Sequence, residues 1–183
     1  MPQHLYANEF VSELDFHYCK IKPKGLIGWS SLKHLYFGYT SLPDDVINEV
    51  LMGSLRPESL ELHECYDFYQ LDIVSKSLNK LVIDSYYAKT EWYFPLELEI
   101  VAPKIESMEI IGNFYDMRKR QIKDMLALVM VKVNFEIDID FEGEDEEEDL
   151  FKACENIVRE LFESLHQVKR LVIGKWCLMV SFS

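Results

Sequence analysis

The sequence has few basic residues and few cysteines for its length. Of 183 residues, 19 are lysine or arginine and 32 are aspartate or glutamate, which gives a formal net charge of −13. Nucleic acid and anionic membranes attract basic surfaces, so we expect neither as a partner. The four cysteines, Cys19, Cys65, Cys154 and Cys177, fit neither a dense disulfide framework nor a paired Cys-x-x-Cys zinc site. This pattern favours a reducing compartment, and we expect a cytoplasmic or nuclear protein.

No targeting or membrane-spanning segment is evident. Residues 1–4 provide neither the basic region nor the apolar region of a signal peptide. No apolar run approaches the ~20 residues that cross a bilayer. Hydrophobic residues still make up 49% of the chain, which is enough for a sizeable core and too many for a disordered protein.

The motifs of common catalytic chemistry are also absent. The chain contains no Gly-x-Ser-x-Gly, no His-Glu-x-x-His and no phosphate-binding Gly-x-x-x-x-Gly-Lys-Ser/Thr. Residues 138–149 superficially match a calcium-binding loop with Gly143 correctly placed. Asp149 at the twelfth place is shorter than the usual glutamate, however, and the alternation before the loop predicts a strand instead of a helix. We therefore expect no enzyme, no cofactor and no metal site.

What the sequence does contain is a repeat of the form Leu-x-x-Leu-x-Leu-x-x-Asn/Cys. Its second fixed place is filled in turn by Leu14, Leu35, Leu60, Leu81, Met108, Val131 and Leu171. The steps between them are 21, 25, 21, 27, 23 and 40 residues. Leucine-rich repeats run about 20–29 residues, so five of the six steps fit. The alternative is a set of ordinary amphipathic strands with even spacing.

The repeat predicts an α/β leucine-rich-repeat solenoid, with residues 1–183 as a single domain of about seven irregular repeats. Side chains alternate along each strand, so every copy has one apolar face that stacked neighbours must cover. We expect an irregular horseshoe with parallel strands on its concave face and helices and loops on its convex face. An acidic loop plus a long helix, beginning at Leu150, is expected as an insertion at about 142–167.

Other segments are expected on the convex side. Residues 41–52 predict a helix that Pro43 opens and Gly53 ends. Residues 96–100 predict an extra extended segment, and residues 117–124 predict a solvated loop. Repeat arrays need polar terminal units, and both ends of this array are apolar in sequence, so we also expect exposed apolar ends.

Several segments have the form of one known family: 11–19 (VSELDFHYC), 31–37 (SLKHLYF), 58–65 (ESLELHEC), 77–83 (SLNKLVI) and 100–110 (IVAPKIESMEI). Together with the late acidic run, the long helix and residues 168–174 (VKRLVIG), they resemble plant F-box/leucine-rich-repeat proteins over about residues 10–177. In that family an F-box binds the adaptor of a cullin-type ubiquitin ligase, and the repeats select the protein to be ubiquitinated. The resemblance thus implies a substrate receptor whose partner is an unknown protein.

The chain departs from the family pattern at three places. No F-box precedes Val11, Pro57 replaces an apolar residue, and the chain ends where the family continues. Residues 42–51 resemble the opening of an F-box, but the chain turns at Gly53, so we interpret them as the helix of a repeat. We expect a fragment or truncated member that binds the ligase adaptor only if a longer form supplies an F-box. The alternatives are a scaffold independent of ubiquitination and a truncated product without a binding function.

The positions between the fixed apolar residues are the candidate binding site, because they point away from the core. They are Glu13, Asp15, His17, His34, Tyr36, Ser59, Glu61, His63, Lys80, Val82, Asp84, Ser107 and Glu109. Aromatic, imidazole and acidic groups side by side suit a protein-binding surface. The alternative is that they form only the solvated side of the strands.

Two histidine–cysteine pairs in this frame suggest zinc at first sight. They are His17 with Cys19 and His63 with Cys65. The frame places the histidines on the concave face, whereas the cysteines end the strand and turn into the core. We therefore predict structural cysteines and not a zinc site.

Overall fold

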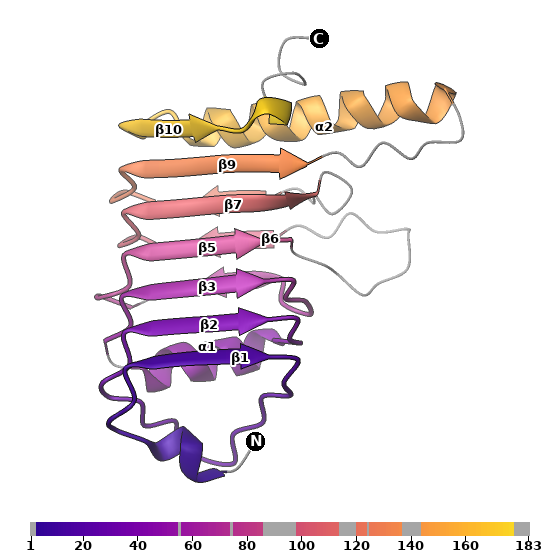
Figure 1. The fold of residues 1–183 in the computed structure, drawn as a ribbon. Helices are drawn as coiled ribbons and strands as arrows, with labels where there is room; N and C mark the ends of the chain where they lie inside the picture. Colours follow the sequence, from indigo (N-terminus) through magenta and orange to yellow (C-terminus); the bar gives the residue numbers. More distant parts are fainter. Residues whose placement is uncertain are drawn as a thin grey trace.

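Seven parallel strands form one side of the molecule, one strand for each copy of the repeat (Figure 1). In spatial order they are β1 (Glu13–His17), β2 (His34–Gly38), β3 (Ser59–His63), β5 (Lys80–Asp84), β7 (Ser107–Asn113), β9 (Met130–Glu136) and β10 (Arg170–Ile173). The structure, a computed structural model, describes residues 3–54, 56–73, 75–85, 98–113, 120–123, 125–136 and 144–177. The second fixed place of the repeat is in register across the whole sheet, from Leu14 to Leu171. The solenoid expected from the repeat period is confirmed.

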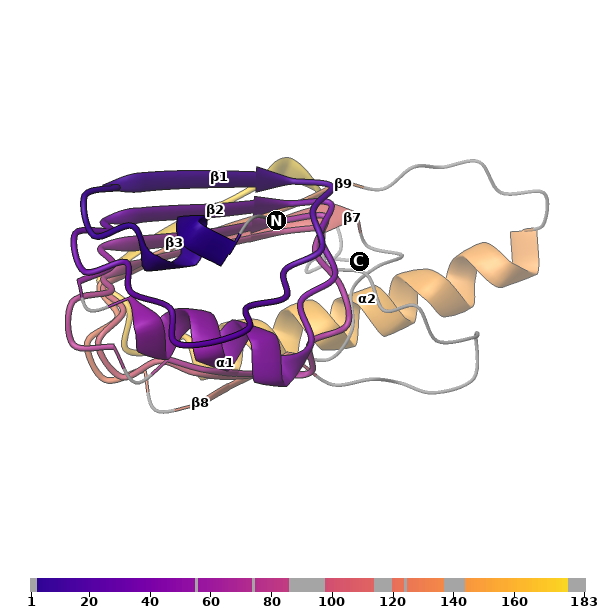
Figure 2. The same ribbon diagram turned by 90° about the horizontal axis from the view of Figure 1, so that it is seen from below.

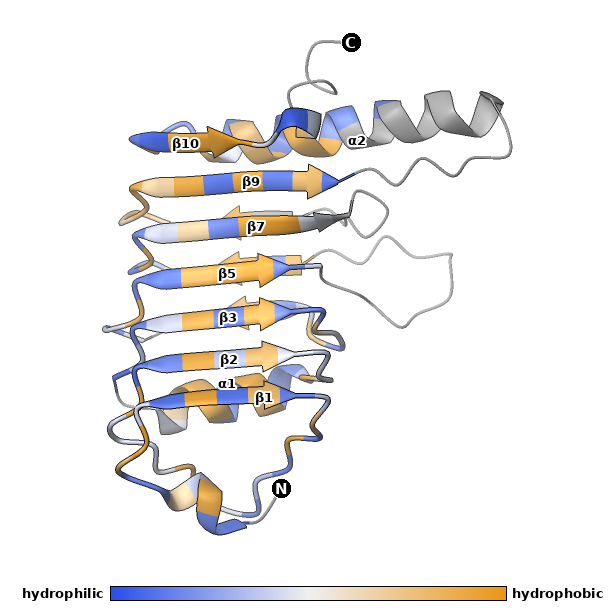
Figure 3. Ribbon diagram, viewed as in Figure 1, coloured by the Kyte–Doolittle hydropathy of each residue, from blue (hydrophilic) through white to orange (hydrophobic). Residues whose placement is uncertain are grey.

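The fixed apolar residues form the core behind this sheet. Leu35, Leu60 and Leu81 lie side by side on neighbouring strands and are at most 1% exposed. Hydrophobic and hydrophilic residues alternate along most of the strands (Figure 3). Each strand therefore has one apolar side, and the neighbouring strands cover it.

The opposite layer contains a second parallel sheet in addition to helices. Its strands are β4 (Gln70–Asp72), β6 (Leu98–Val101) and β8 (Arg120–Lys123), in that order. The seven-stranded sheet and this layer lie on the two sides of the core (Figure 2). β6 confirms the expected extended segment, whereas the loop expected at 117–124 is wrong for residues 120–123. Ile122 packs against the core, and Lys123 forms an ion pair with Glu99 of the neighbouring strand at 2.9 Å.

The first helix forms as expected but ends for a different reason. α1 (Asp44–Gly53) buries Ile47 and Val50. Gly53 is the last helical residue, and the chain leaves the helix through Ser54 in an extended conformation. A Cβ atom added at Gly53 would overlap the side chain of Ile27, so glycine is required by this close approach. A left-handed terminating turn, the usual role of such a glycine, is not formed here.

The long helix begins earlier than expected. α2 (Glu144–Ser164) includes acidic residues that we assigned to a loop, while residues 142 and 143 lie outside the described residues. Glutamate is a good helix former, and carboxylates stabilise the first turn of a helix, so an acidic run suits this position. Val158 and Leu161 bury the apolar side of the helix in the core. None of the described helices is long and apolar enough to cross a membrane.

The segment before the first strand covers one end of the core. η1 (Gln3–Ala7) places the Tyr6 ring against Trp29 with the ring centroids 5.9 Å apart, and both residues are at most 2% exposed. Trp29 also packs against Phe16 of β1. Leu5, Phe10 and Leu26 nevertheless remain 39%, 91% and 97% exposed, so apolar side chains are accessible at this end, as expected.

The other end of the sheet is covered less. Leu171 and Val172 of β10 are 40% and 37% exposed, and β10 has a neighbouring strand on one side only. Residues 178–182, which also entered the expectation of an apolar end, lie outside the described residues. Apolar side chains are thus accessible at this end of the sheet, as expected.

Candidate protein-binding surface

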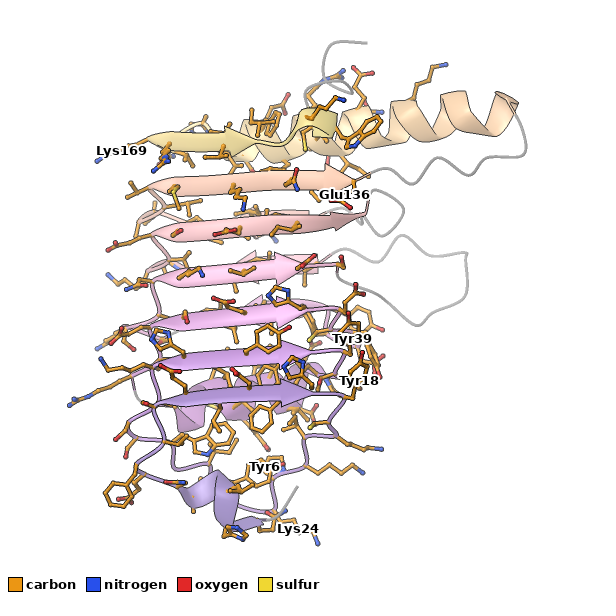
Figure 4. All side chains as sticks on the ribbon, viewed as in Figure 1. Tyr6, Tyr18, Lys24, Tyr39, Glu136 and Lys169 are labelled. Atoms are coloured by element: carbon orange, nitrogen blue, oxygen red, sulfur yellow. The ribbon has the colours of Figure 1, made fainter. Side chains whose placement is uncertain are left out.

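All thirteen candidate residues lie on the open face, which we define as the face of the seven-stranded sheet that points away from the core (Figure 4). Parallel pairing arranges them in three rows that run across the strands. The first row is Glu13, His34, Ser59, Lys80 and Ser107; the second is Asp15, Tyr36, Glu61, Val82 and Glu109; the third is His17, His63 and Asp84. No described helix or strand covers this face (Figure 1, Figure 2). Their role in binding stays a prediction.

Two of the thirteen residues offer little surface. Ser59 is 6% exposed and Val82 is 4% exposed. The Ser59 hydroxyl lies 2.9 Å from Nδ1 of His34 and helps to hold that ring. Both residues therefore support the face more than they present contacts to a partner.

Three rings form a stack across the first three strands. The His17 and Tyr36 ring centroids are 4.8 Å apart, and Tyr36 lies at the same distance from His63. Gly38 makes room for this stack, because an added Cβ would lie 2.8 Å from Nδ1 of His17 and 3.0 Å from the Tyr36 ring. Gly38 is not among the predicted residues. Its signal in the sequence is a glycine at the strand position where the first and third copies carry histidine.

A hydrogen-bonded ion pair extends the stack to the next strand. Nδ1 of His63 lies 3.0 Å from Oδ2 of Asp84, and the Ser85 hydroxyl donates to the other carboxylate oxygen at 2.9 Å. The hydrogen bond between His63 and Asp84 raises the pKa of His63, while partial burial opposes the rise. The hydrogen bond from His63 lowers the pKa of Asp84. The pair is therefore favoured as imidazolium and carboxylate.

Most other carboxylates near the middle of the face are also paired. Glu61 accepts a hydrogen bond from the Lys80 ammonium at 2.7 Å. Glu109 accepts one from Lys132 at 3.2 Å. Oε2 of Glu61 is 3.8 Å from Nε2 of His63, which is too long for a hydrogen bond, so this buried nitrogen has no hydrogen-bond partner. The centre of the face is thus close to charge balance.

The edge of the open face carries a stacked pair of tyrosines. Tyr18 and Tyr39 follow β1 and β2 directly, and their rings are 4.6 Å apart with an angle of 7° between the planes. They are 76% and 45% exposed. Figure 4 shows both at the ends of the first two strands. The Tyr39 pKa is raised by Tyr18 and then by Glu64. This exposed aromatic pair was not among the predicted residues.

The tyrosines belong to a turn that the repeat copies share. Tyr18, Tyr39, Glu64 and Ser85 follow four successive strands of the sheet, with φ between 50° and 52°. The backbone N–H of each donates to a carbonyl of the neighbouring strand at 2.8–3.0 Å. Positive φ is uncommon for residues other than glycine. The signal in the sequence was positional only, since all four follow the third fixed place by two residues.

The cysteine of the third copy is structural. Cys65 is 1% exposed, and its thiol lies 3.3 Å from the Phe37 carbonyl. Burial raises the pKa of Cys65 to about 12, so the residue is a neutral thiol, whereas zinc binding requires a thiolate. His63 lies on the open face while Cys65 lies in the core, as the repeat frame predicted. Among the residues that the structure describes, no three His, Cys, Asp or Glu side chains form a possible metal site.

The chain is similar in sequence to three proteins of Arabidopsis thaliana. An F-box/LRR-repeat protein is 31% identical over 112 residues, which cover 60% of this chain and 23% of that protein. An F-box protein is 30% identical over 158 residues, with coverage of 86% and 48%. A putative F-box/LRR-repeat protein is 30% identical over 108 residues, with coverage of 57% and 22%. The chain thus spans less than half of the length of each relative.

Two further comparisons found no match. No family model matches the chain. No solved structure matches it either.

Proposed function

We propose that this chain, which is similar to F-box and F-box/LRR-repeat proteins, is a protein of that type whose open face selects a protein substrate for a cullin-type ubiquitin ligase. The observation that carries the proposal is the open face itself. Side chains of unlike chemistry stand there in three ordered rows, and no described element covers them. A regular uncovered sheet of this kind suits a protein partner.

The position of the cavities supports a protein partner over a small molecule. Small ligands bind in concave pockets that enclose most of their surface. A cavity of about 490 Å³ is lined by α1, the end of β4 and the segment after β4, including Met52, Asp72 and Ser75. These elements belong to the layer opposite the open face. The candidate residues therefore offer an extended surface instead of a pocket.

Adaptor binding would need residues other than the helix that resembles an F-box. Leu42, Ile47 and Val50 are 0% exposed, because they pack into the core of the solenoid. Adaptor docking through these residues would require that core to open. We propose that an F-box in a longer form binds the adaptor, while the present residues recognise the substrate.

We also propose that the protein acts in the cytoplasm or the nucleus, where cullin-type ligases act. Cys19, Cys65 and Cys177 form no disulfide within the described part of the chain, and free thiols are kept reduced in these compartments. A fluorescent fusion of the full chain, imaged in plant cells, tests this proposal. Accumulation in the secretory pathway would contradict it.

Site-specific photo-crosslinking tests which face contacts a partner. A benzophenone amino acid replaces Glu109 on the open face or, as the matched control, Glu99 in the second sheet. Each of these glutamates forms one lysine ion pair, at 3.2 Å for Glu109 and 2.9 Å for Glu99. After crosslinking in plant cells, we expect proteins that are captured from position 109 and not from position 99. Equal capture from both positions would refute binding through the open face.

The ligase part of the proposal has its own readout. The half-life of a protein captured from position 109 is measured with and without inhibition of cullin-type ligases. A substrate should persist for longer when the ligases are inhibited. An unchanged half-life would refute the substrate-receptor role and favour a scaffold independent of ubiquitination.

A further inference from the structure

We propose that the aromatic patch, defined as Tyr18, Tyr36 and Tyr39, binds an arginine side chain of the partner protein, with Asp15 and Glu64 as its carboxylates. This inference rests on the proposed function, because it assigns the chemistry of one part of the open face. Tyr18 and Tyr39 directly follow the first two strands (Figure 4), and Tyr36 lies within β2, in register with Asp15.

The exposed tyrosine pair is the first observation. Tyr18 and Tyr39 stack in parallel, yet they are 76% and 45% exposed and bury little of their rings. Both occupy left-handed backbone conformations, with φ of 51° and 52°. Glycine or asparagine adopts this conformation at a lower energetic cost, and Glu64 and Ser85 share it, so the turn itself does not call for an aromatic residue. Fold stability alone does not explain two aromatic side chains at these positions.

The carboxylates beside the patch are the second observation. Farther along the sheet, Glu61 pairs with Lys80 and Glu109 pairs with Lys132. Among the described residues, no cation pairs with Asp15 in the same way, although Asp15 is exposed and lies in register with Tyr36 on the neighbouring strand. Its negative charge acts on the Tyr36 hydroxyl and contributes to the raised pKa of Tyr36, for which burial is the main cause. The first two strands therefore have an excess of negative charge.

Glu64 places a second carboxylate at the other side of the patch. It occupies the turn position that follows Tyr39 in the next copy, and its charge raises the pKa of the Tyr39 hydroxyl. Like Asp15, it forms no ion pair within the described part of the chain. Negative charge thus flanks the aromatic rings on both sides, which complements a cationic side chain from outside.

Arginine fits this arrangement better than lysine. A guanidinium group is planar, so it stacks on an aromatic ring and donates two parallel hydrogen bonds to a carboxylate. A lysine ammonium is a compact point charge that keeps its water more tightly. The exposed rings of Tyr18 and Tyr39 offer the faces, while Tyr36 is held between His17 and His63 and contributes its hydroxyl edge. Ring faces beside carboxylates are the two features that separate arginine from lysine.

The test measures binding of three fluorescein-labelled peptides to the full chain by fluorescence anisotropy. The peptides have the sequence Gly-Ser-X-Gly-Ser-X-Gly-Ser, where X is arginine, lysine or the neutral arginine analogue citrulline. We expect the arginine peptide to bind several-fold more tightly than the lysine peptide and the citrulline peptide to bind most weakly. Tyr39→Ala and Asp15→Asn should each weaken binding of the arginine peptide about tenfold, as expected for loss of a cation–π contact or a charged hydrogen bond.

Two matched variants control for aromatic content and for net charge. Phe10→Ala removes a ring that is 91% exposed and precedes β1, and Asp72→Asn removes a charge from an exposed position of the second sheet. Neither should change the affinity by more than about twofold. Tyr39→Phe keeps the ring and should bind almost as well as the unchanged chain. Thermal unfolding of each variant shows whether the fold is intact.

Three results would overturn the inference. The first is no saturable binding of the arginine peptide up to about 1 mM. The second is equal binding of the arginine and lysine peptides. The third is an equal loss of affinity in Asp15→Asn and Asp72→Asn, which would show a general charge effect. In each case capture from position 109 in the crosslinking experiment would leave the proposed function standing, and equal capture from positions 109 and 99 would refute that function separately.

Discussion

Leucine at the second fixed place should stabilise the array in proportion to its burial, and Leu60→Ala with Leu171→Ala tests this. Leu60 is 0% exposed between two neighbouring strands, whereas Leu171 lies on the last strand of the sheet and is 40% exposed. Removal of three fully buried carbons costs about 2.4 kcal/mol in transfer free energy, and the cavity adds roughly 1 kcal/mol. We therefore expect a loss of about 3–4 kcal/mol for Leu60→Ala and about 1–1.5 kcal/mol for Leu171→Ala.

Urea unfolding followed by far-ultraviolet circular dichroism measures both free energies of unfolding. The slope of the free energy of unfolding against urea concentration should be unchanged, because unfolding exposes nearly the same surface area in both variants. Equal losses at the two positions would refute the reasoning that each copy is stabilised by the neighbours that cover its apolar face. A loss below about 1 kcal/mol for Leu60→Ala would refute the central position of this strand in the core.

Three further predictions concern the open face and the cysteines. His63 has a raised pKa in the folded chain. Its contribution to stability is therefore complete below its unfolded pKa and is lost as pH rises through the folded pKa. His63→Gln should accordingly lower the free energy of unfolding more at about pH 5.5 than at about pH 8. Equal losses at the two pH values, measured by urea unfolding, would contradict this. Gly38→Ala should destabilise the fold by about 1 kcal/mol and change the near-ultraviolet circular dichroism of the ring stack, because the new Cβ would collide with it. Gly25→Ala is the control, because a Cβ added at Gly25 would have no other atom within 4 Å. An equal effect of both changes would contradict the role assigned to Gly38. Iodoacetamide at about pH 8 should modify half-buried Cys19 in the folded chain much faster than Cys65, whose pKa is raised to about 12, and mass spectrometry of the alkylated peptides would expose the opposite order.

The seven-stranded sheet could be predicted because its pattern has a single physical cause. Apolar residues must meet apolar residues between stacked copies, so the second fixed place from Leu14 to Leu171 determines both the number of strands and their register. The second sheet has no such constraint. β4 and β8 contain only three and four residues, and their sequence separation from the fixed places of the repeat differs from copy to copy. Residues 117–124 are polar and locally basic, so the sequence predicted a loop where β8 forms.

The candidate face could be predicted for a similar reason, while its internal contacts could not. Alternation places Glu61, His63 and Lys80 on the open face whatever the details of packing. Their pairing depends on which side chain of the next strand lies within reach. The steps between copies vary from 21 to 27 residues, with different loops between the strands, so one copy does not indicate which side chain its neighbour places beside it. The pairs of Glu61 with Lys80 and of His63 with Asp84 emerged only with the register. Pairing is a property of two copies together, and no single copy contains it.

The tyrosine pair could not be predicted from a single copy of the repeat. The repeat template describes residues that are buried, because burial is what the copies share. Tyr18 and Tyr39 lie just beyond the strands, in a turn whose geometry is set by the hydrogen bond from each backbone N–H to the next strand. Any residue at that position must accept positive φ, and the third and fourth strands place Glu64 and Ser85 there. The turn is therefore a feature of the fold, whereas the aromatic identity at its first two places is not required by the fold. A residue that the fold tolerates but does not require is where selection for a partner can act. The inference of an arginine site therefore rests on these two side chains and not on the repeated frame of the sheet.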